Sequence, residues 1–99
     1  MGNILEKELE QKLVQRVTAA GGRCLKWVSP GASGVPDRII LLPGGHILFA
    51  ELKRPKGSRV APLQRWWAQA LQSLGFRVHL VYTLDDLRAL DDLLQEGKS

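Results

Sequence analysis

Three charged residues stand beside apolar runs in the middle of this 99-residue chain. Asp37 comes directly before one apolar run, and Glu51 and Lys53 come at the end of the next. Charged side chains next to apolar segments lose hydration, so they need partners, a metal ion or a chemical role. Two carboxylates that lie close together repel, and a hard divalent cation between them removes that repulsion. With an ammonium group beside them, the set favours metal-assisted phosphodiester hydrolysis.

The turn between the two runs decides whether the three residues converge. Glu51 and Lys53 share a face, because side chains alternate along a strand. A two-residue loop at Gly44 and Gly45 would send Asp37 to the other face, whereas a three-residue loop over 43–45 would set it across from Glu51. The "PGG" sequence suits the three-residue loop, which we predict. The alternative role for these charges is a cross-strand ion network at a solvated end of the sheet.

Apolar spacing predicts the elements that position these residues. Helical spacing and stop signals indicate helices over 4–20, from Pro62 to Gly75 and from Thr83 onward, the last opened by a capping box of Thr83 and Asp86. Strands are expected over 23–28, 36–42, 46–53 and 76–82. The predicted order is α, β, β, β, α, β, α. This order indicates an α/β fold with a small mixed β-sheet flanked by helices, in one domain over 1–99.

Composition and charge limit the classes of function. Hydrophobic residues make up 44% and charged residues 24%, as in globular proteins, and no apolar run is long enough to cross a bilayer. Because the first residues are acidic where a signal peptide is basic, we expect an intracellular, cytoplasmic protein. Cys24 is the single cysteine and is expected to be a buried structural thiol. Neither His46 nor His79 has a further ligand at metal-binding spacing.

The net charge of +4 favours a polyanionic partner, nucleic acid first. A solvated basic face is the alternative. The basic residues gather in the middle of the chain, and those expected to contact DNA phosphates are Arg38, Arg54, Lys56, Arg59 and Arg65.

The motifs resemble those of a known nuclease family. "PD" at 36–37 and "ELK" at 51–53 resemble the PD-(D/E)XK signature. The fuller pattern "GGRCLKWVSPGASGVPDRIILLPGGHILFAELKRPKGSRVAPLQ" is similar to the VRR-NUC branch, in its phage-type stand-alone form. The likeness runs from the first helix to about Tyr82. It implies a restriction-endonuclease-like core, a Mg2+-dependent DNA endonuclease in which Mn2+ can substitute, and a phage-encoded protein in the host cell.

The resemblance also implies roles for particular residues. Asp37 and Glu51 would be metal ligands, the main-chain carbonyl of Leu52 a third ligand, and Lys53 the residue beside the attacking water. Gln64 matches a glutamine near the start of the second helix, where it would orient a catalytic group or contact the backbone.

A glutamate of the first helix usually completes such a site, and Glu6, Glu8 and Glu10 compete for that role. Glu6 and Glu10 lie in a helical row with valines expected to face the protein body, while Glu8 lies on the wet side. We expect Glu10 as the ligand and Glu6 as second choice. Their alternative role is ordinary negative charge in the first turns of a helix.

The resemblance further implies a homodimer that cuts branched DNA such as a Holliday junction. Trp66, off the main apolar stripe of its helix, and the leucines of the last helix are candidates for an interface. Those leucines can equally be core, and Trp66 can be a half-buried flank or a surface for stacking on DNA. Two other classes of function remain open: a non-catalytic DNA-binding module with a nuclease-like fold, and a protein-interaction domain whose basic loop meets an acidic partner.

Overall fold

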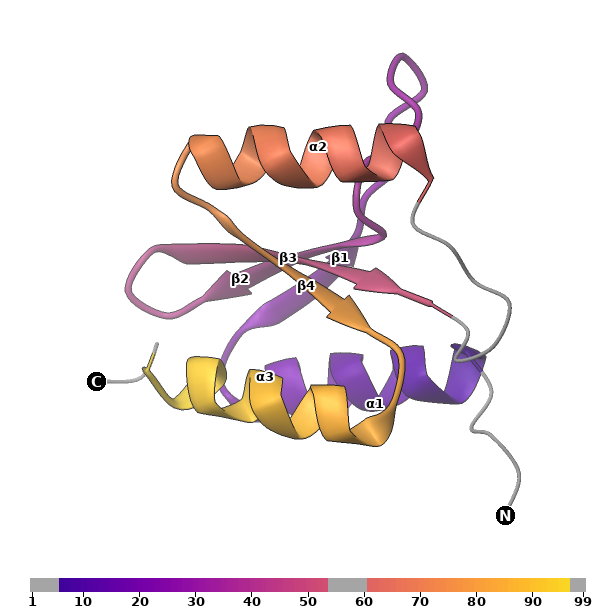
Figure 1. Cartoon of the computed structure of the whole chain (residues 1–99). Helices are drawn as coiled ribbons and strands as arrows, with labels where there is room; N and C mark the ends of the chain where they lie inside the picture. Colours follow the sequence, from indigo (N-terminus) through magenta and orange to yellow (C-terminus); the bar gives the residue numbers. More distant parts are fainter. Residues whose placement is uncertain (1–5, 54–60, 97–99) are drawn as a thin grey trace.

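Seven elements follow one another in the order that the sequence predicts. The computed structural model describes residues 6–53 and 61–96. Within them lie α1 (Glu6–Ala19), β1 (Arg23–Lys26), β2 (Arg38–Leu42), β3 (His46–Leu52), α2 (Pro62–Ser73), β4 (Arg77–Val81) and α3 (Leu84–Glu96) (Figure 1). The predicted α/β class with a mixed sheet flanked by helices is confirmed.

The four strands form one sheet in the order β1-β2-β3-β4. The first three are antiparallel neighbours, while β4, which follows α2, pairs with β3 in parallel. The second strand begins at Arg38 rather than at residue 36, because Pro36 has no N–H to give to a ladder. Asp37 still accepts a backbone hydrogen bond of 2.9 Å from the N–H of Trp27 at its carbonyl oxygen. Asp37 therefore lies at the entry of β2, where its backbone is fixed and its side chain is not buried in the ladder.

Helices cover both faces of the sheet, with α1 and α3 on one face and α2 on the other (Figure 1). Even-numbered residues of β2 and β3 point toward α1 and α3, where they form the main core with leucines of both helices. This core contains Leu9, Leu13, Val17, Ile40, Leu42, Leu48, Ala50, Leu52, Val81, Leu87, Leu90 and Leu94. Odd-numbered residues of β3, including Phe49 and Glu51, consequently face α2.

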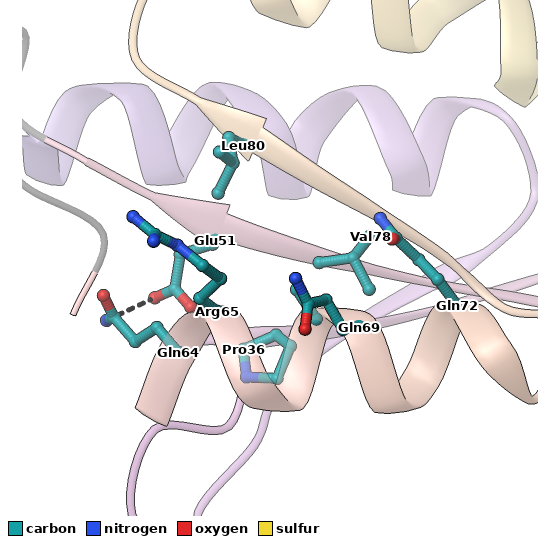
Figure 2. A pocket seen from close by; sticks show the side chains of 9 residues that line it. Pro36, Glu51, Gln64, Arg65, Gln69, Gln72, Val78 and Leu80 are labelled. Atoms are coloured by element: carbon teal, nitrogen blue, oxygen red, sulfur yellow. Dashed lines mark hydrogen bonds between the residues drawn. The ribbon is translucent and has the colours of Figure 1, made fainter. Parts of the chain in front are cut away.

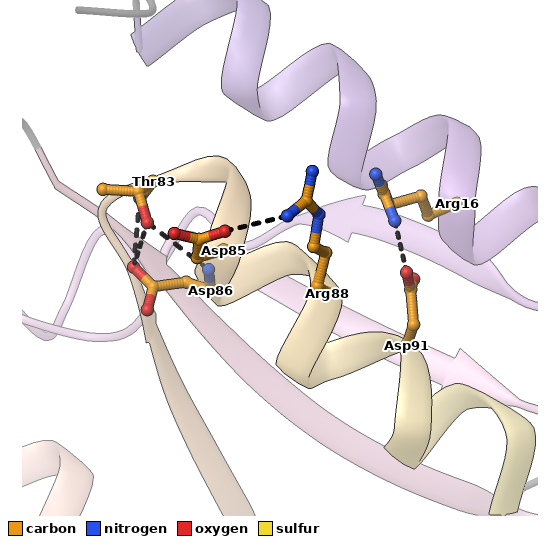
Figure 3. Close-up of polar contacts among 6 residues, drawn as sticks. All are labelled: Arg16, Thr83, Asp85, Asp86, Arg88 and Asp91. Carbon is orange, nitrogen blue, oxygen red and sulfur yellow. Dashed lines mark hydrogen bonds and ion pairs between the residues drawn. The ribbon is translucent and has the colours of Figure 1, made fainter.

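Polar contacts fix α3 against the rest of the fold (Figure 3). The Asp86 carboxylate accepts hydrogen bonds from the N–H groups of Tyr82, at 2.7 Å, and Thr83, at 3.0 Å. The Thr83 hydroxyl accepts a weaker bond of 3.4 Å from the Asp86 N–H. The predicted capping box is confirmed, and an ion pair between Arg16 and Asp91 links α3 to α1.

Three leucines of α3 belong to the core. Leu87, Leu90 and Leu94 are buried against the sheet and α1, and Leu84 is partly exposed at the helix start. The interface that the sequence suggested for this face is therefore excluded for the three buried leucines, because α1 and the sheet already cover them. No helix in the described part of the chain is long and apolar enough to cross a membrane.

Candidate active site

The turn between β2 and β3 has the three-residue form that the sequence predicts. Leu42 pairs with His46, which leaves 43–45 as the loop, and Gly44 and Gly45 both have positive φ angles, of 84° and 80°. Such angles are readily adopted by glycine and costly for most other residues. Because Arg38 pairs with Ala50, the next positions outward along the same register are Asp37 and Glu51. The hairpin prediction is confirmed, and these two residues lie across from each other on the α2 face.

The Asp37 side chain crosses to the neighbouring strand. Its Oδ2 atom accepts a hydrogen bond of 2.9 Å from the backbone N–H of Leu52. A carboxylate has room for further bonds at both oxygens, so this contact fixes the direction of Asp37 without using its capacity to hold a cation. The Asp37 carboxylate is thereby held at Leu52 of β3, the residue that follows Glu51.

Gln64 joins the other two charged residues of the site. Its Oε1 accepts hydrogen bonds from Lys53 Nζ, at 2.5 Å, and from the N–H of Ala61, at 3.1 Å. Its Nε2 donates to Glu51 Oε1 at 3.4 Å (Figure 2). Only this orientation of the amide gives each partner the complementary atom, since Lys53 and the Ala61 N–H are donors and the Glu51 carboxylate is an acceptor.

Local sequence explains why Gln64 can reach all three partners. Pro62 begins α2 because its missing N–H costs nothing in the first turn, and its ring fixes a helical φ. Gln64 is then the third residue of the helix, from which a glutamine can fold back to the N–H before the helix. The cap contact to Ala61 holds the amide between β3 and α2. Gln64 is thus a helix cap and a link between Glu51 and Lys53 at once.

A cavity of about 300 Å³ lies between α2 and the sheet beside this cluster. Figure 2 shows the Glu51 carboxylate at one end of it, next to Gln64 and Arg65 of α2. Glu51 is only 4% exposed, whereas Arg65 is exposed and brings a cation to the rim. The remaining lining residues are Pro36, Ala68, Gln69, Gln72, Val78 and Leu80. Asp37 and Lys53 lie outside this lining, so the cavity meets the cluster on the Glu51 side alone.

Glu10, the expected first-helix ligand, is not brought to the Asp37 and Glu51 pair. Its Oε1 lies 3.2 Å from Nη2 of Arg38. Arg38 follows Asp37 in the strand and so points to the opposite face, toward α1. Glu10 is consequently paired on the α1 face, and the sheet lies between α1 and α2 (Figure 1). Glu6, the second choice, begins α1, and its side chain lies outside the described residues, as do Arg54, Lys56 and Arg59.

The ion pair with Glu10 places Arg38, one of the residues expected to bind DNA, inside the fold. Its side chain is only 14% exposed, and it also donates a hydrogen bond of 3.4 Å to the carbonyl oxygen of Cys24. Arg38 therefore acts inside the fold, between β1, β2 and α1. Cys24 is half-buried, and burial raises the pKa of its thiol, with Arg38 opposing this shift and Glu10 adding to it. This environment fits the structural role expected for the cysteine.

Two carboxylates among the described residues, those of Asp37 and Glu51, are the candidates for oxygen ligands of a metal ion. No group of three or more His, Cys, Asp and Glu side chains in ranges 6–53 and 61–96 could hold an ion. Asp37 and Glu51, supplemented by the backbone carbonyl of Leu52 and by water, still offer the hard oxygen donors that Mg2+ takes. Mg2+ normally keeps several waters and needs only one or two protein carboxylates. The donor set therefore fits such an ion.

Gly34, in "GVPD", contributes to the site and is absent from the predicted set of site residues. It has a φ of 87°, and a Cβ atom there would lie 2.7 Å from Leu63 Cβ and 2.8 Å from Leu63 C. The glycine thus lets the loop before β2 lie directly on the first turn of α2. This contact brings Asp37 and Gln64, which are far apart in sequence, to the same end of the sheet. The signal that could have identified it is a glycine three residues before the aspartate.

Comparisons with known proteins bear on the family and the fold of the chain. No family model matches the chain. It is 41% identical over 87 residues to "Putative nuclease p44" of Acyrthosiphon pisum secondary endosymbiont phage 1. The aligned residues cover 88% of this chain and 91% of that protein. A solved structure described as "VRR_NUC domain" has a TM-score of 0.77 and 28% identity over 95% of this chain and 97% of its own. A second, "VRR_NUC domain protein", has a TM-score of 0.61 at 18% identity, over 98% of this chain and 90% of its own, and shows the fold alone.

The phage relative spans nearly the whole of this chain, and the fold matches VRR-NUC structures from end to end. The chain belongs to the VRR-NUC family of the PD-(D/E)XK nuclease superfamily, as a phage-type member.

Proposed function

We propose that this chain is a Mg2+-dependent DNA endonuclease that hydrolyses phosphodiester bonds at branched DNA, with Mn2+ as a substitute ion. The observation that carries the proposal is the hydrogen-bonded series from Lys53 through Gln64 to Glu51, with Asp37 fixed beside it. A buried carboxylate and an ammonium group linked by an amide at one end of a sheet serve no evident need of the core. The phage relative named as a nuclease supports the same class of activity.

Each residue of the series has a distinct task in this reaction. Asp37 and Glu51 hold Mg2+, with the carbonyl of Leu52 as a further oxygen ligand, and the ion when bound supplies positive charge to the phosphoryl oxygens. Lys53 holds the attacking water by hydrogen bonding and stabilises negative charge that develops on it. Gln64 keeps Lys53 and Glu51 at a fixed spacing, so that less reorganisation is needed in the transition state. Arg65 at the rim attracts the phosphate backbone.

The proposal extends to a homodimer. A four-way junction has two strands to be cut symmetrically, and a two-fold dimer presents two sites related in the same way. Exposed apolar side chains of β1, β2 and β3 support a second copy on the sheet: Leu25, Leu41 and Ile47 are 47%, 36% and 41% exposed. Light scattering of the purified protein gives the mass that tests this part.

A nicking assay on a labelled four-way junction tests the catalytic part. The expected result is paired, symmetric nicks with Mg2+ and none with EDTA, and weaker cutting of a linear duplex. Binding of the junction without nicking under every metal condition would instead identify a non-catalytic DNA-binding module. Failure to bind any DNA would leave the protein-interaction class. Equal cutting of both substrates would remove the preference for branches and leave the nuclease in place.

A further inference from the structure

Trp66 presents an aromatic ring to solvent from the first half of α2. The residue is 58% exposed, so more than half of its surface is open to solvent. Its ring meets that of Trp67 edge-on, with centroids 5.1 Å apart and planes at 87°. Trp67 packs in the same way against Trp27, at 6.2 Å, and Trp27 lies against Phe49 of β3, at 5.3 Å. A series of rings that begins in the sheet therefore holds the exposed indole in place.

An apolar hollow lies beside this indole. Its walls are the first turns of α2 and the loop that Gly34 brings against Leu63. The lining residues are Ala32, Ser33, Pro62, Leu63, Trp66 and Trp67. Such a hollow, with a fixed indole on one side and little polar surface, accepts a flat apolar ring better than a charged group.

The charge of the α2 sequence indicates the kind of molecule that carries the ring. The sequence of α2, "PLQRWWAQALQS", contains no acidic residue and includes the exposed Arg65, and Arg54, Lys56 and Arg59 precede the helix in the chain. This composition favours an anionic partner. A second copy of the chain docked symmetrically with α2 against its own α2 would bring together two helices that carry Arg65 and no acidic residue, which costs free energy. Rings on an anionic backbone are the defining features of a nucleic acid strand.

The hollow and the cavity at Glu51 lie on different sides of the first two turns of α2, because the side chains of consecutive helical residues diverge. Gln64 and Arg65 line the cavity at Glu51, while Leu63 and Trp66, on either side of them in sequence, line the hollow. We infer that Trp66 and this hollow bind an unpaired base of the DNA whose phosphate enters the active site. The inference rests on the proposed nuclease function and adds a contact to it: an unpaired base held by Trp66 while the phosphate of the same DNA lies at Glu51.

Binding without cleavage tests the inference. The probes are a fluorescein-labelled duplex with a single unpaired thymine and the same duplex fully paired, titrated in Ca2+ in place of Mg2+. The readout is the ratio of the two dissociation constants. Trp66→Leu, which keeps apolar area but removes the aromatic face, should reduce the preference for the unpaired base about tenfold, as expected for loss of one stacked base. Trp66→Phe should retain most of it. Leu74→Ala, which removes another exposed apolar side chain beside α2, should leave the ratio unchanged.

Two results would overturn the inference. One is an unchanged ratio in Trp66→Leu, and the other is a fall in molecular mass by light scattering in Trp66→Ala, which would assign the surface to a second copy. Circular dichroism establishes that each variant is folded. In the wild-type protein, quenching of tryptophan fluorescence by the unpaired probe, reduced in Trp66→Phe, gives a second readout. The nuclease proposal fails separately, if no Mg2+-dependent nicking is found. In that case the ratio of the two dissociation constants still tests whether Trp66 binds an unpaired base.

Discussion

Lys53 Nζ donates a hydrogen bond of 2.5 Å to Oε1 of Gln64, a residue that belongs to a different element and reaches back to β3 from the start of α2. The same amide donates to Glu51. The spacing of the ammonium and carboxylate groups therefore depends on how α2 docks on the sheet, as well as on β3 itself.

Gln64→Ala should reduce the rate of junction nicking about a hundredfold, because misplacing reacting groups by about 1 Å has effects of this size. The free energy of unfolding should fall by only about 1 kcal/mol, the usual net contribution of a lost hydrogen bond. Single-turnover nicking at saturating Mg2+ and urea unfolding measure the two effects. Gln15→Ala, an exposed glutamine of α1, is the matched control. A stability loss with an unchanged rate would reduce Gln64 to a helix cap.

Asp37→Asn, Glu51→Gln and Lys53→Ala should each abolish detectable nicking while leaving the fold and most of the DNA affinity intact. The first two keep the shape of the side chain and remove the charge that holds the cation, and the third removes the group that orients water. Lys12→Ala, at an exposed position of α1, controls for loss of a lysine. Circular dichroism and anisotropy in Ca2+ accompany the assay. Joint loss of folding and affinity would favour a structural ion network.

Gly34→Ala should destabilise the protein by about 1–3 kcal/mol, the range for a non-glycine residue held at positive φ. The added methyl also meets Leu63 at 2.7 Å, so the loop must move away from α2 and nicking should slow as well. Gly31→Ala in the same loop is the control, because a Cβ atom there meets nothing within 4 Å. Thermal unfolding and the nicking rate of the two variants give the comparison. Equal melting temperatures would show that the contact at Gly34 does not constrain the loop.

Arg38 and Arg65 should differ in how they affect DNA binding. Arg65→Gln should reduce the slope of log affinity against log salt by about 1, as expected when one phosphate contact is lost. Arg38→Gln should leave that slope unchanged and lower the free energy of unfolding, because Arg38 pairs with Glu10 inside the fold. Affinity titrations of one duplex at several salt concentrations, with urea unfolding, separate the effects. A reduced slope for Arg38→Gln would restore its predicted role in DNA binding.

His79 should make the fold less stable at mildly acidic pH. Burial lowers the pKa of His79 below its ordinary value of 6.5, and the Arg77 cation lowers it further. The unfolded chain therefore binds this proton at higher pH than the folded chain. The contribution of His79 to stability is complete above about pH 6.5 and is lost as the pH falls toward and through the lowered pKa. Urea unfolding across this range should show a weaker pH dependence in His79→Gln than in a His46→Gln control.

The helices and strands, their order and the register of the β2–β3 hairpin are all predictable from local sequence patterns. Alternation along a strand places Glu51 and Lys53 on one face, and "PGG" sets the register that brings Asp37 across from Glu51. Both depend on local backbone geometry, which neighbouring residues fix without reference to the rest of the chain. The convergence of Asp37 and Glu51 at one end of the hairpin therefore follows from the sequence alone.

Which helical residues join Asp37, Glu51 and Lys53 depends on tertiary packing. Glu10 and Arg38 pair on the opposite face, and Gln64 links Glu51 to Lys53. Trp66 remains exposed, while Leu87, Leu90 and Leu94 of α3 are buried. Helical spacing identifies an apolar stripe but leaves the side chains at its edges free to face the sheet or solvent. Which way they face depends on how α1, α2 and α3 pack on a sheet assembled from distant segments, and that is a property of the whole chain.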